Sequence, residues 1–573
     1  MSTRPKFLRI AVVLLLSLGC ERGPDSGPAN VTFSRDVAPI LFQNCSPCHR
    51  PGESGPFNLL SYADAKKRAR QIADVTADRY MPPWKPAPGY GEFLGERRLT
   101  DAQIQLLRRW ADLSAPEGNP ANLPPMPIWN EGWHLGEPDL VVEMPRPYSL
   151  QAGDGDVFRN FVIPLPLSER RYVRALELRP GNPRVVHHAV IMLDRDGVAR
   201  RQDARDSEPG FDGMELGEVQ RPGGHFLGWA PGTMPYAVPD SLAWDLEPGN
   251  DLVLQLHLLP SGKPELVQAR VGFFFSDTPP TRSPVLLRLG RKDIDIPAGK
   301  SDYVIEDSYT LPVDVDVLSV YPHAHYLGSA VEAYASLPNG DREWLIRIDD
   351  WDFNWQNYYR YAKPVSLPRG TTLHMRYTYD NSRANERNPN HPPQRVRYGT
   401  QSRDEMGDFI VQVLPRTSAG GELIRRDFAR KWLRQEIDGY ETLLKTDPDN
   451  ADHHHILGIF YMARSVSAKA VWHLREALRL RSDFPEAHLN MATALLSSRQ
   501  PRKAEQHLRR ALELRPEYGD AHLNLGMLLG RMNRTDEALD HLDTAARLLP
   551  KLAGEISALT ANVRQQRSSR RPP

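Results

Sequence analysis

The C-terminal part of the chain repeats itself every 34 residues, and no other feature constrains its fold as strongly. Small residues recur at two positions of the repeat: Gly458, Ala492 and Gly526 at one, and Ala470, Ala504 and Ala538 at the other. Small residues at a fixed period let two helices pack closely, and each such pair buries its apolar face only against the next pair. The period therefore predicts an α-solenoid over residues 417–555.

This pattern resembles tetratricopeptide repeats, and about three repeats fit, with Glu422 to Leu444 as a leading helix. Such a module binds proteins or packs against its own neighbours, and the sequence leaves both options open. His453, His454 and His455 lie on the first helix of a repeat, where successive side chains diverge by about 100°. We therefore expect a solvated face there and no metal site. Residues 556–573 form a tail, and we expect its end from Arg567 to be disordered.

Length and composition set broad limits. A chain of 573 residues favours about three or four domains. Lysine plus arginine equals aspartate plus glutamate, 72 against 72, so no net charge draws the chain to nucleic acid. The 51 prolines favour loop-rich β-structure and linkers. The three cysteines are Cys20, Cys45 and Cys48, and their positions leave none for a structural disulfide.

Residues 1–20 carry basic residues, then a short apolar run from Ile10, then Gly19-Cys20. This composition predicts a secretory signal, because the apolar run is too short for a confident membrane span. Gly19-Cys20 resembles the bacterial lipoprotein cleavage box, although Ser17 stands where leucine is usual. We expect an exported protein, periplasmic or membrane-anchored through a lipid on Cys20. Ordinary secretion is the alternative.

The motif Cys45-Ser-Pro-Cys48-His49 is the C-x-x-C-H pattern of covalent haem attachment. Two cysteines would hold the porphyrin, and His49 would reach the iron. A thioredoxin-like or zinc C-x-x-C is the alternative, but a zinc site needs a second ligand pair that the cysteine count does not supply.

The flanks of this motif agree with a small helical domain that resembles cytochrome c and covers residues 31–115. The run from Phe33 reads as a helix entering the motif, and a closing helix starts at the cap Thr100. Met81 is a candidate second axial ligand that would raise the reduction potential, although a loop methionine is commonly a packing residue. Residues 116–130 are rich in proline and predict an extended linker.

Residues 131–416 show short alternating apolar runs broken by glycine and proline, which predict two antiparallel β-sandwiches, 131–285 and 286–416. Candidate metal ligands are spread through these runs: His187, His188, His257, His323, His325 and Met406. His323 and His325 project from one face of a strand. Adjacent His187 and His188 can share a metal only where the strand is bulged or ends; otherwise one is a core residue and the other exposed. Imidazoles with a thioether favour copper that cycles through Cu(I).

The order of these ligands resembles the copper type II, ascorbate-dependent monooxygenases, such as the peptidylglycine α-hydroxylating and dopamine β-monooxygenases. The resemblance implies two jelly-roll-like copper domains beside a solvent-filled cleft. His187, His188 and His257 would hold an electron-transfer copper, with Gln255 also matching the pattern. His323, His325 and Met406 would form the catalytic copper site, which activates oxygen.

The chain also departs from that family. It has no disulfides in these domains, although the animal enzymes do. Tyr321, Asp408 and Ile410 stand where the peptide-processing enzyme has an arginine, an asparagine and a tyrosine that grip a peptide carboxylate. A glycine-extended peptide is therefore not the expected substrate.

We expect an exported enzyme that hydroxylates a C–H bond with O₂, with two copper ions and haem c, and with electrons from an electron-donor protein through the haem or from ascorbate. The alternative is a non-catalytic, copper-binding electron-transfer lipoprotein with a protein-docking module. A third possibility is that the copper only passes electrons onward. We expect His225 to be a solvated loop residue, with a position lining the cleft as the alternative. We expect the aromatic cluster around Trp351 and Tyr359 to belong to a core, with a substrate pocket as the alternative.

Overall fold

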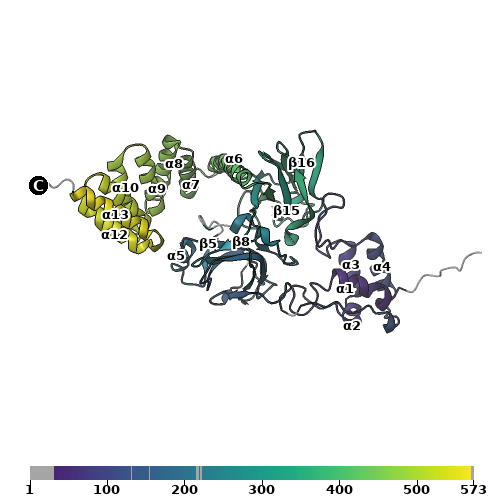
Figure 1. The fold of residues 1–573 in the computed structure, drawn as a ribbon. Helices are drawn as coiled ribbons and strands as arrows, with labels where there is room; N and C mark the ends of the chain where they lie inside the picture. The colour runs from purple at the N-terminus through teal and green to yellow at the C-terminus, as the bar shows by residue number, and fades with distance from the viewer. Residues whose placement is uncertain (1–30, 131, 154, 214–218, 220–221, 569–573) are drawn as a thin grey trace, which may run out of the picture. The chain divides into compact units, whose positions relative to one another are not determined.

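The computed structural model describes residues 31–130, 132–153, 155–213, 219 and 222–568 (Figure 1). The predicted signal segment and Cys20 lie outside these residues. The chain divides into two compact units, and the second takes in residues 52–56, 83–98 and everything from 128 onward. Among the described helices, none combines the length and the apolarity needed to cross a membrane.

The first unit is a small helical bundle with a core of its own. Its closing helix α4 (Asp101–Asp112) begins at a capping box in which Thr100 and Gln103 satisfy each other's backbone N–H groups. Leu107 and Trp110 of α4 are fully buried. The other helical segments are η1 (Phe33–Val37), α1 (Ala38–Asn44), α2 (Tyr62–Lys67), α3 (Ala69–Ala77) and the short turn η2 (Pro120–Asn122).

The first β-domain contains two larger sheets, ordered β1-β11-β4-β8 and β6-β3-β9-β5-β7, and the small pair β10-β2. All their strand pairs are antiparallel, and one hydrophobic cluster takes side chains from both large sheets, as in a sandwich. The elements are β1 (Leu140–Glu143), β2 (Tyr148–Leu150), β3 (Val157–Pro164), β4 (Arg171–Arg179), β5 (Val186–Asp194), α5 (Val198–Asp203), β6 (Phe211–Asp212), η3 (Pro222–Gly224), β7 (Gly228–Trp229), η4 (Asp240–Leu242), β8 (Trp244–Leu246), β9 (Asp251–Leu258), β10 (Glu265–Val267) and β11 (Arg270–Ser276).

The second β-domain repeats this architecture with sheets β12-β21-β15-β18 and β14-β19-β16-β17 and the pair β13-β20. Its core is the largest of the chain and again joins the two larger sheets. The elements are β12 (Val285–Gly290), β13 (Asp295–Ile296), β14 (Tyr303–Thr310), β15 (Val315–Ala324), β16 (Gly328–Ser336), β17 (Arg342–Ile348), η5 (Phe353–Trp355), β18 (Tyr359–Leu367), β19 (Thr372–Tyr379), β20 (Val396–Arg397) and β21 (Gly407–Pro415). The alternating apolar runs thus form sandwich strands, as the sequence predicts.

The prediction of one uninterrupted helical domain over 31–115 is wrong for residues 83–98. Phe93 is buried in the core of the second β-domain and forms an isolated bridge with Tyr361. Leu94 N–H donates to the Arg360 carbonyl at 2.8 Å, and Lys85 pairs with Asp350 at 2.8 Å. Apolar burial in another domain therefore takes this loop out of the helical unit, which its position between α3 and α4 in the sequence does not reveal.

The C-terminal helices form antiparallel hairpins stacked side by side, as the period predicts (Figure 1). Glycine at the repeated position lets the helices approach: a Cβ added to Gly458 would lie 2.5 Å from Leu474, and one on Gly526 would lie 2.8 Å from Leu542. The helices are α6 (Ser418–Thr446), α7 (Ala451–Ala463), α8 (Ser467–Leu480), α9 (Pro485–Ser497), α10 (Pro501–Leu514), α11 (Gly519–Arg531) and α12 (Thr535–Leu548), followed by the turn η6 (Pro550–Leu552) and α13 (Ala553–Ser568).

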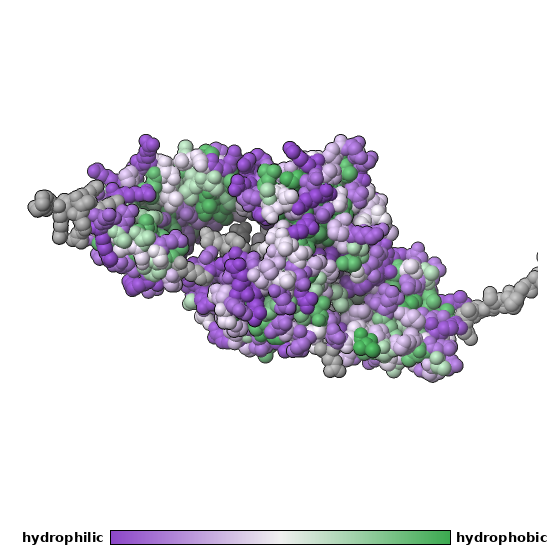
Figure 2. All heavy atoms as spheres, viewed as in Figure 1, coloured by the Kyte–Doolittle hydropathy of each residue, from purple (hydrophilic) through white to green (hydrophobic). Residues whose placement is uncertain are grey.

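Two predictions for this region need correction. Residues 556–568 are helical, because α13 buries Ile556 against Leu542 and Ala545 of the last repeat. Residues 569–573 lie outside the described part. His454 is buried, 5% exposed, so the three consecutive histidines do not form a solvated face. On the face drawn in Figure 2, hydrophilic residues dominate, with small hydrophobic patches that include one over the repeat helices.

Candidate metal centres

A β-bulge brings the adjacent histidines of β5 to one side. The pairing of β5 with β9 shifts register between Val186 and His188, so that His187 is the extra residue. His188 then stands directly opposite His257 of β9. The nitrogen atoms of His187, His188 and His257 all lie within 4.8 Å of one another, in an arrangement that could hold a metal ion. We call these three residues the first cluster.

The rings of the first cluster face one another through their Nδ1 atoms. The Nδ1 of His188 lies 3.1 Å from that of His187 and 3.4 Å from that of His257. Asp156, just before β3, approaches the other side of His257, with its Oδ2 3.4 Å from Nε2. The same carboxylate accepts a 2.6 Å hydrogen bond from Ser402 N–H. Sequence reasoning missed Asp156, which stands outside every motif.

Burial keeps the imidazoles of His187 and His188 neutral. It lowers the pKa of His187 to about 3 and the pKa of His188 well below its ordinary value, and the neighbouring imidazoles add to both shifts. Despite its own burial, the pKa of Asp156 falls to about 2, because the adjacent His257 imidazole and hydrogen bonds from Ser402 stabilise its charged form. Neutral imidazole is the form that binds a metal.

The second cluster, His323, His325 and Met406, lies at the end of β15 and the start of β21. His323 Nδ1 is 2.5 Å from Gln356 Oε1, and His325 Nδ1 is 3.1 Å from the Asp404 carbonyl. Each Nδ1 must carry the proton to donate, which leaves each Nε2 lone pair for a metal. Burial also lowers the pKa of His325 to about 3. Gln356 is a further residue that the sequence analysis did not identify.

The pairing of β15 with β21 brings Met406 next to this histidine pair. Ala324 pairs with Gly407 and His323 with Asp408, so Met406 continues β21 toward His325. The thioether is buried, 6% exposed.

Glu405 accepts hydrogen bonds from the backbone of both segments that carry the second cluster. This fully buried carboxylate accepts from the backbone N–H groups of His325 at 2.5 Å, Leu327 at 2.9 Å and Met406 at 3.0 Å. Burial raises the pKa of Glu405 to about 8, against these hydrogen bonds. Its position beside Met406 in Asp-Glu-Met was the one signal in the sequence that could have identified it.

Two tyrosines of β19 reach across the second sandwich to the same strands. Tyr379 donates to the Met406 carbonyl at 2.8 Å, and Tyr377 donates to the Asp408 carbonyl at 2.7 Å. Trp351 donates to the His325 carbonyl at 3.2 Å and is buried, as expected for the aromatic cluster. The backbone that carries the ligands is therefore fixed from the opposite sheet.

Phe353 touches both clusters. Its ring stacks on His187 at 4.4 Å between centroids and meets His325 edge-on at 5.5 Å. The two sets of predicted ligands thus lie around one aromatic side chain. The resemblance implied a solvent-filled cleft at this place, so the Phe353 ring is a finding that the sequence did not predict.

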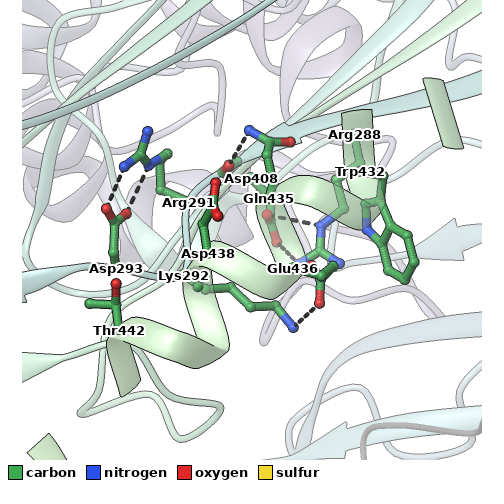
Figure 3. A pocket seen from close by; sticks show the side chains of 12 residues that line it. Arg288, Arg291, Lys292, Asp293, Asp408, Trp432, Gln435, Glu436, Asp438 and Thr442 are labelled. Carbon is green, nitrogen blue, oxygen red and sulfur yellow. Dashed lines mark hydrogen bonds and ion pairs between the residues drawn. The ribbon is translucent and has the colours of Figure 1, made fainter. Parts of the chain in front are cut away.

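Tyr321, Asp408 and Ile410, which stand where the peptide-processing enzyme binds a peptide carboxylate, have other partners in this chain. Asp408 forms a two-bond ion pair with Arg288, at 2.9 and 2.7 Å, in a pocket with Lys292 and Glu436 (Figure 3). Tyr321 stacks on Phe226 at 4.5 Å, and Ile410 is buried. One side of His323 is therefore aromatic. On the other side, the charges of Asp408 and Arg288 neutralise each other.

His225 is also buried, 4% exposed, which corrects the expectation of a solvated loop residue. Its Nδ1 lies 3.5 Å from the Gln412 amide nitrogen, and burial lowers its pKa to about 4. Gly224, the residue before it, lies so close to Pro284 that an added Cβ would overlap the Pro284 carbonyl.

In the helical unit, Cys45, Cys48 and His49 share one helical turn. The N–H groups of Cys48 and His49 both donate to the Cys45 carbonyl, at 3.1 and 2.9 Å. His49 is 9% exposed and its Nδ1 lies 3.0 Å from the Phe57 carbonyl, which leaves Nε2 for an axial bond. These features fit covalent haem. Met81 follows α3 and donates its N–H to the Val75 carbonyl at 3.0 Å; no described contact joins its sulfur to His49.

Comparison with known proteins identifies only the C-terminal part. Residues 495–563 match the tetratricopeptide repeat family. The solved structure of MamA protein is 24% identical over 25% of this chain and 82% of its own, with a TM-score of 0.21. YrrB, a TPR protein with an unusual peptide-binding site, is 22% identical over 26% of this chain and 76% of its own, with a TM-score of 0.23. No curated protein matches the chain. Residues 495–563 are thus tetratricopeptide repeats, and the helices before them continue the same hairpin pattern.

Proposed function

We propose that this protein is a copper-dependent monooxygenase that hydroxylates a C–H bond of a small organic substrate with O₂. The observation that carries the proposal is the bulge in β5, which gathers His187, His188 and His257 within 4.8 Å. A core histidine pair has no need of a bulge that turns both rings to one side.

The chain's own groups divide the work between the clusters. His187, His188 and His257 offer three imidazoles, which hold copper in both oxidation states with little rearrangement. His323 and His325 offer Nε2 atoms whose direction Gln356 and Asp404 fix, and Met406 adds a soft ligand that favours Cu(I). Copper would supply the one-electron chemistry that activates O₂. One oxygen atom enters the C–H bond and the other leaves as water, which takes two electrons and two protons.

The surroundings of His323 favour a neutral substrate. Tyr321 and Phe226 form an aromatic wall, and Arg288 is already committed to Asp408. A substrate carboxylate would find no available arginine in this set. We therefore propose an apolar or aromatic substrate in place of a peptide acid.

Electrons would enter through haem c held by Cys45, Cys48 and His49, with Met81 as the second axial ligand, or from ascorbate as external reductant. We further propose that the protein is exported and anchored through Cys20, and that the repeats dock a protein partner, which could be the electron donor. Full turnover of a His49→Ala variant with a protein donor would show that the haem does not deliver the electrons. Turnover of the same variant with ascorbate tests whether the copper sites remain intact.

The proposal is tested by counting copper per chain and by measuring oxygen uptake during a substrate screen. We expect two coppers in the sandwiches, one lost in a His187→Ala variant and the other in a His323→Ala variant, and substrate-dependent oxygen uptake only in the parent. Copper binding without oxygen uptake for any substrate would favour the second candidate, a non-catalytic electron-transfer scaffold. The repeats agree with either candidate, because a docking module serves a scaffold as well as an enzyme.

A further inference from the structure

Every complete repeat carries a pair of histidines at the same two positions. One member lies on the first helix of the hairpin and the other 19 residues later on the second helix. The pairs are His454 with His473, His488 with His507, and His522 with His541. They lie outside both sandwich clusters, and the proposed function makes no use of them.

The geometry of the pair is constant. The two Nδ1 atoms are 3.0 Å apart in the first repeat, 2.9 Å in the second and 2.8 Å in the third. The Nε2 of the first-helix histidine lies close to a backbone carbonyl six residues earlier, at 3.1, 3.2 and 2.9 Å. Since a carbonyl only accepts, Nε2 carries the proton, and the Nδ1 lone pair of this histidine faces its partner.

The side chains beside the pair are not constant. The residue before the second histidine is Trp472 in the first repeat, Gln506 in the second and Asp540 in the third. His454, His473 and His488 are buried, and a buried imidazole costs desolvation that an apolar side chain at the same position would avoid. The pair therefore does more than fill the space between two helices, although one N–H···N hydrogen bond satisfies it in the absence of a ligand.

The spacing suits a shared metal ion. Two imidazole nitrogens bound to one late first-row ion at about 2.0–2.1 Å lie about 2.8–3.4 Å apart when the angle between the bonds is near 90–110°. The first-helix histidine needs no change to bind, because its carbonyl partner already fixes the tautomer, as second-shell carbonyls do in metal sites. In the second-helix histidine the proton moves from Nδ1 to Nε2, so the ion replaces one hydrogen bond without any net loss of protons.

We propose that each of the three repeats holds a two-imidazole site for a late first-row transition-metal ion, with water completing the coordination. Copper(II) is the preferred ion, because it stands highest in the affinity order for nitrogen ligands. The proposal does not depend on the proposed function, since these sites use none of the sandwich ligands.

The test is equilibrium dialysis of the full chain against copper(II), with bound metal counted per chain. A triple variant, His473→Gln with His507→Gln and His541→Gln, is expected to bind three fewer ions than the parent. The matched control is a His455→Gln variant. His455 lies on α7, belongs to none of the three pairs and contacts Asn490, so this variant keeps the parent number of ions. A sandwich variant, His187→Ala with His323→Ala, is expected to lose its own ions and keep these three.

Equal metal binding by the parent and the triple variant would overturn the proposal and leave the pairs as hydrogen bonds. If the triple variant loses helicity, the single variant His541→Gln replaces it, because that half-buried histidine lies in the last repeat. It must then bind one ion fewer with unchanged circular dichroism, and an unchanged ion count contradicts the proposal.

Discussion

The two clusters in the sandwiches use the same imidazole group in opposite ways. In the first cluster the Nδ1 atoms of His187, His188 and His257 face one another at 3.1 and 3.4 Å. In the second, Gln356 and Asp404 occupy the Nδ1 atoms of His323 and His325 from behind. A bulge gathers the first set, whereas a strand end and a buried carboxylate hold the second.

Different groups therefore control the two clusters. The first depends on its own three rings and on one carboxylate, Asp156, so losing a ring removes a third of the ligand set. The second depends on neighbouring groups that fix the orientation of its imidazole rings, so substitutions outside the ligand set should also change its metal affinity.

Replacing His257 by alanine is expected to abolish copper binding at the first cluster and to reduce turnover by more than about 100-fold, beyond the usual effect of an outer-shell change. The second cluster keeps its copper, because it shares no ligand with the first. Metal analysis and oxygen uptake measure both effects. His374→Ala, an imidazole on β19 stacked on Tyr334, is the control that keeps both coppers. Copper loss from both clusters in His257→Ala would show that the two clusters do not bind copper independently.

A Met406→Leu variant keeps the volume of the side chain and removes the thioether. We expect weaker Cu(I) binding at the second cluster with Cu(II) binding nearly unchanged, since the soft sulfur favours the reduced ion. Turnover should fall by about 10- to 100-fold. Competition with a Cu(I) chelator measures the affinity. An unchanged Cu(I) affinity would show that Met406 is a packing residue.

Gln356→Leu removes the acceptor behind His323 without touching a ligand. Copper affinity at the second cluster is expected to fall by about 10- to 100-fold, as for other outer-shell partners. Gln356→Glu should restore most of it, because a carboxylate also accepts from Nδ1. The first cluster serves as the internal control in both variants. If Gln356→Leu weakens the first cluster equally, the two clusters are not supported independently.

Asp156→Asn gives the smallest expected effect. An amide keeps one acceptor oxygen for Ser402 or His257 but loses the charge, so copper affinity at the first cluster should fall by about 10-fold. The unfolding free energy should fall by about 1 kcal/mol, the net contribution of one hydrogen bond. Denaturant titration of the metal-free chain measures the second quantity. A larger loss at the second cluster than at the first would reverse the assignment of Asp156.

Sequence predicted the parts of this molecule that depend on local pattern. The repeat period places Gly458 and Gly526 between helices, and Thr100 starts α4 as a cap. The alternating runs around His257 and His323 form strands. It failed for residues 83–98, because Phe93 buries its ring in a domain distant in sequence, and for His454, whose partner lies on the next helix.

The kinds of candidate ligand, their order along the chain and the strands and helices that carry them follow from local sequence, because side-chain chemistry and hydrophobic period are local properties. The bulge of β5 at His187 and the position of Phe353 against both clusters become visible only in the folded chain. The same holds for the contacts of Asp156, Gln356 and Glu405 with the candidate ligands. These contacts join residues tens to hundreds of positions apart. Strand register and the packing of two sheets set such contacts, and neither is written in any short stretch of sequence.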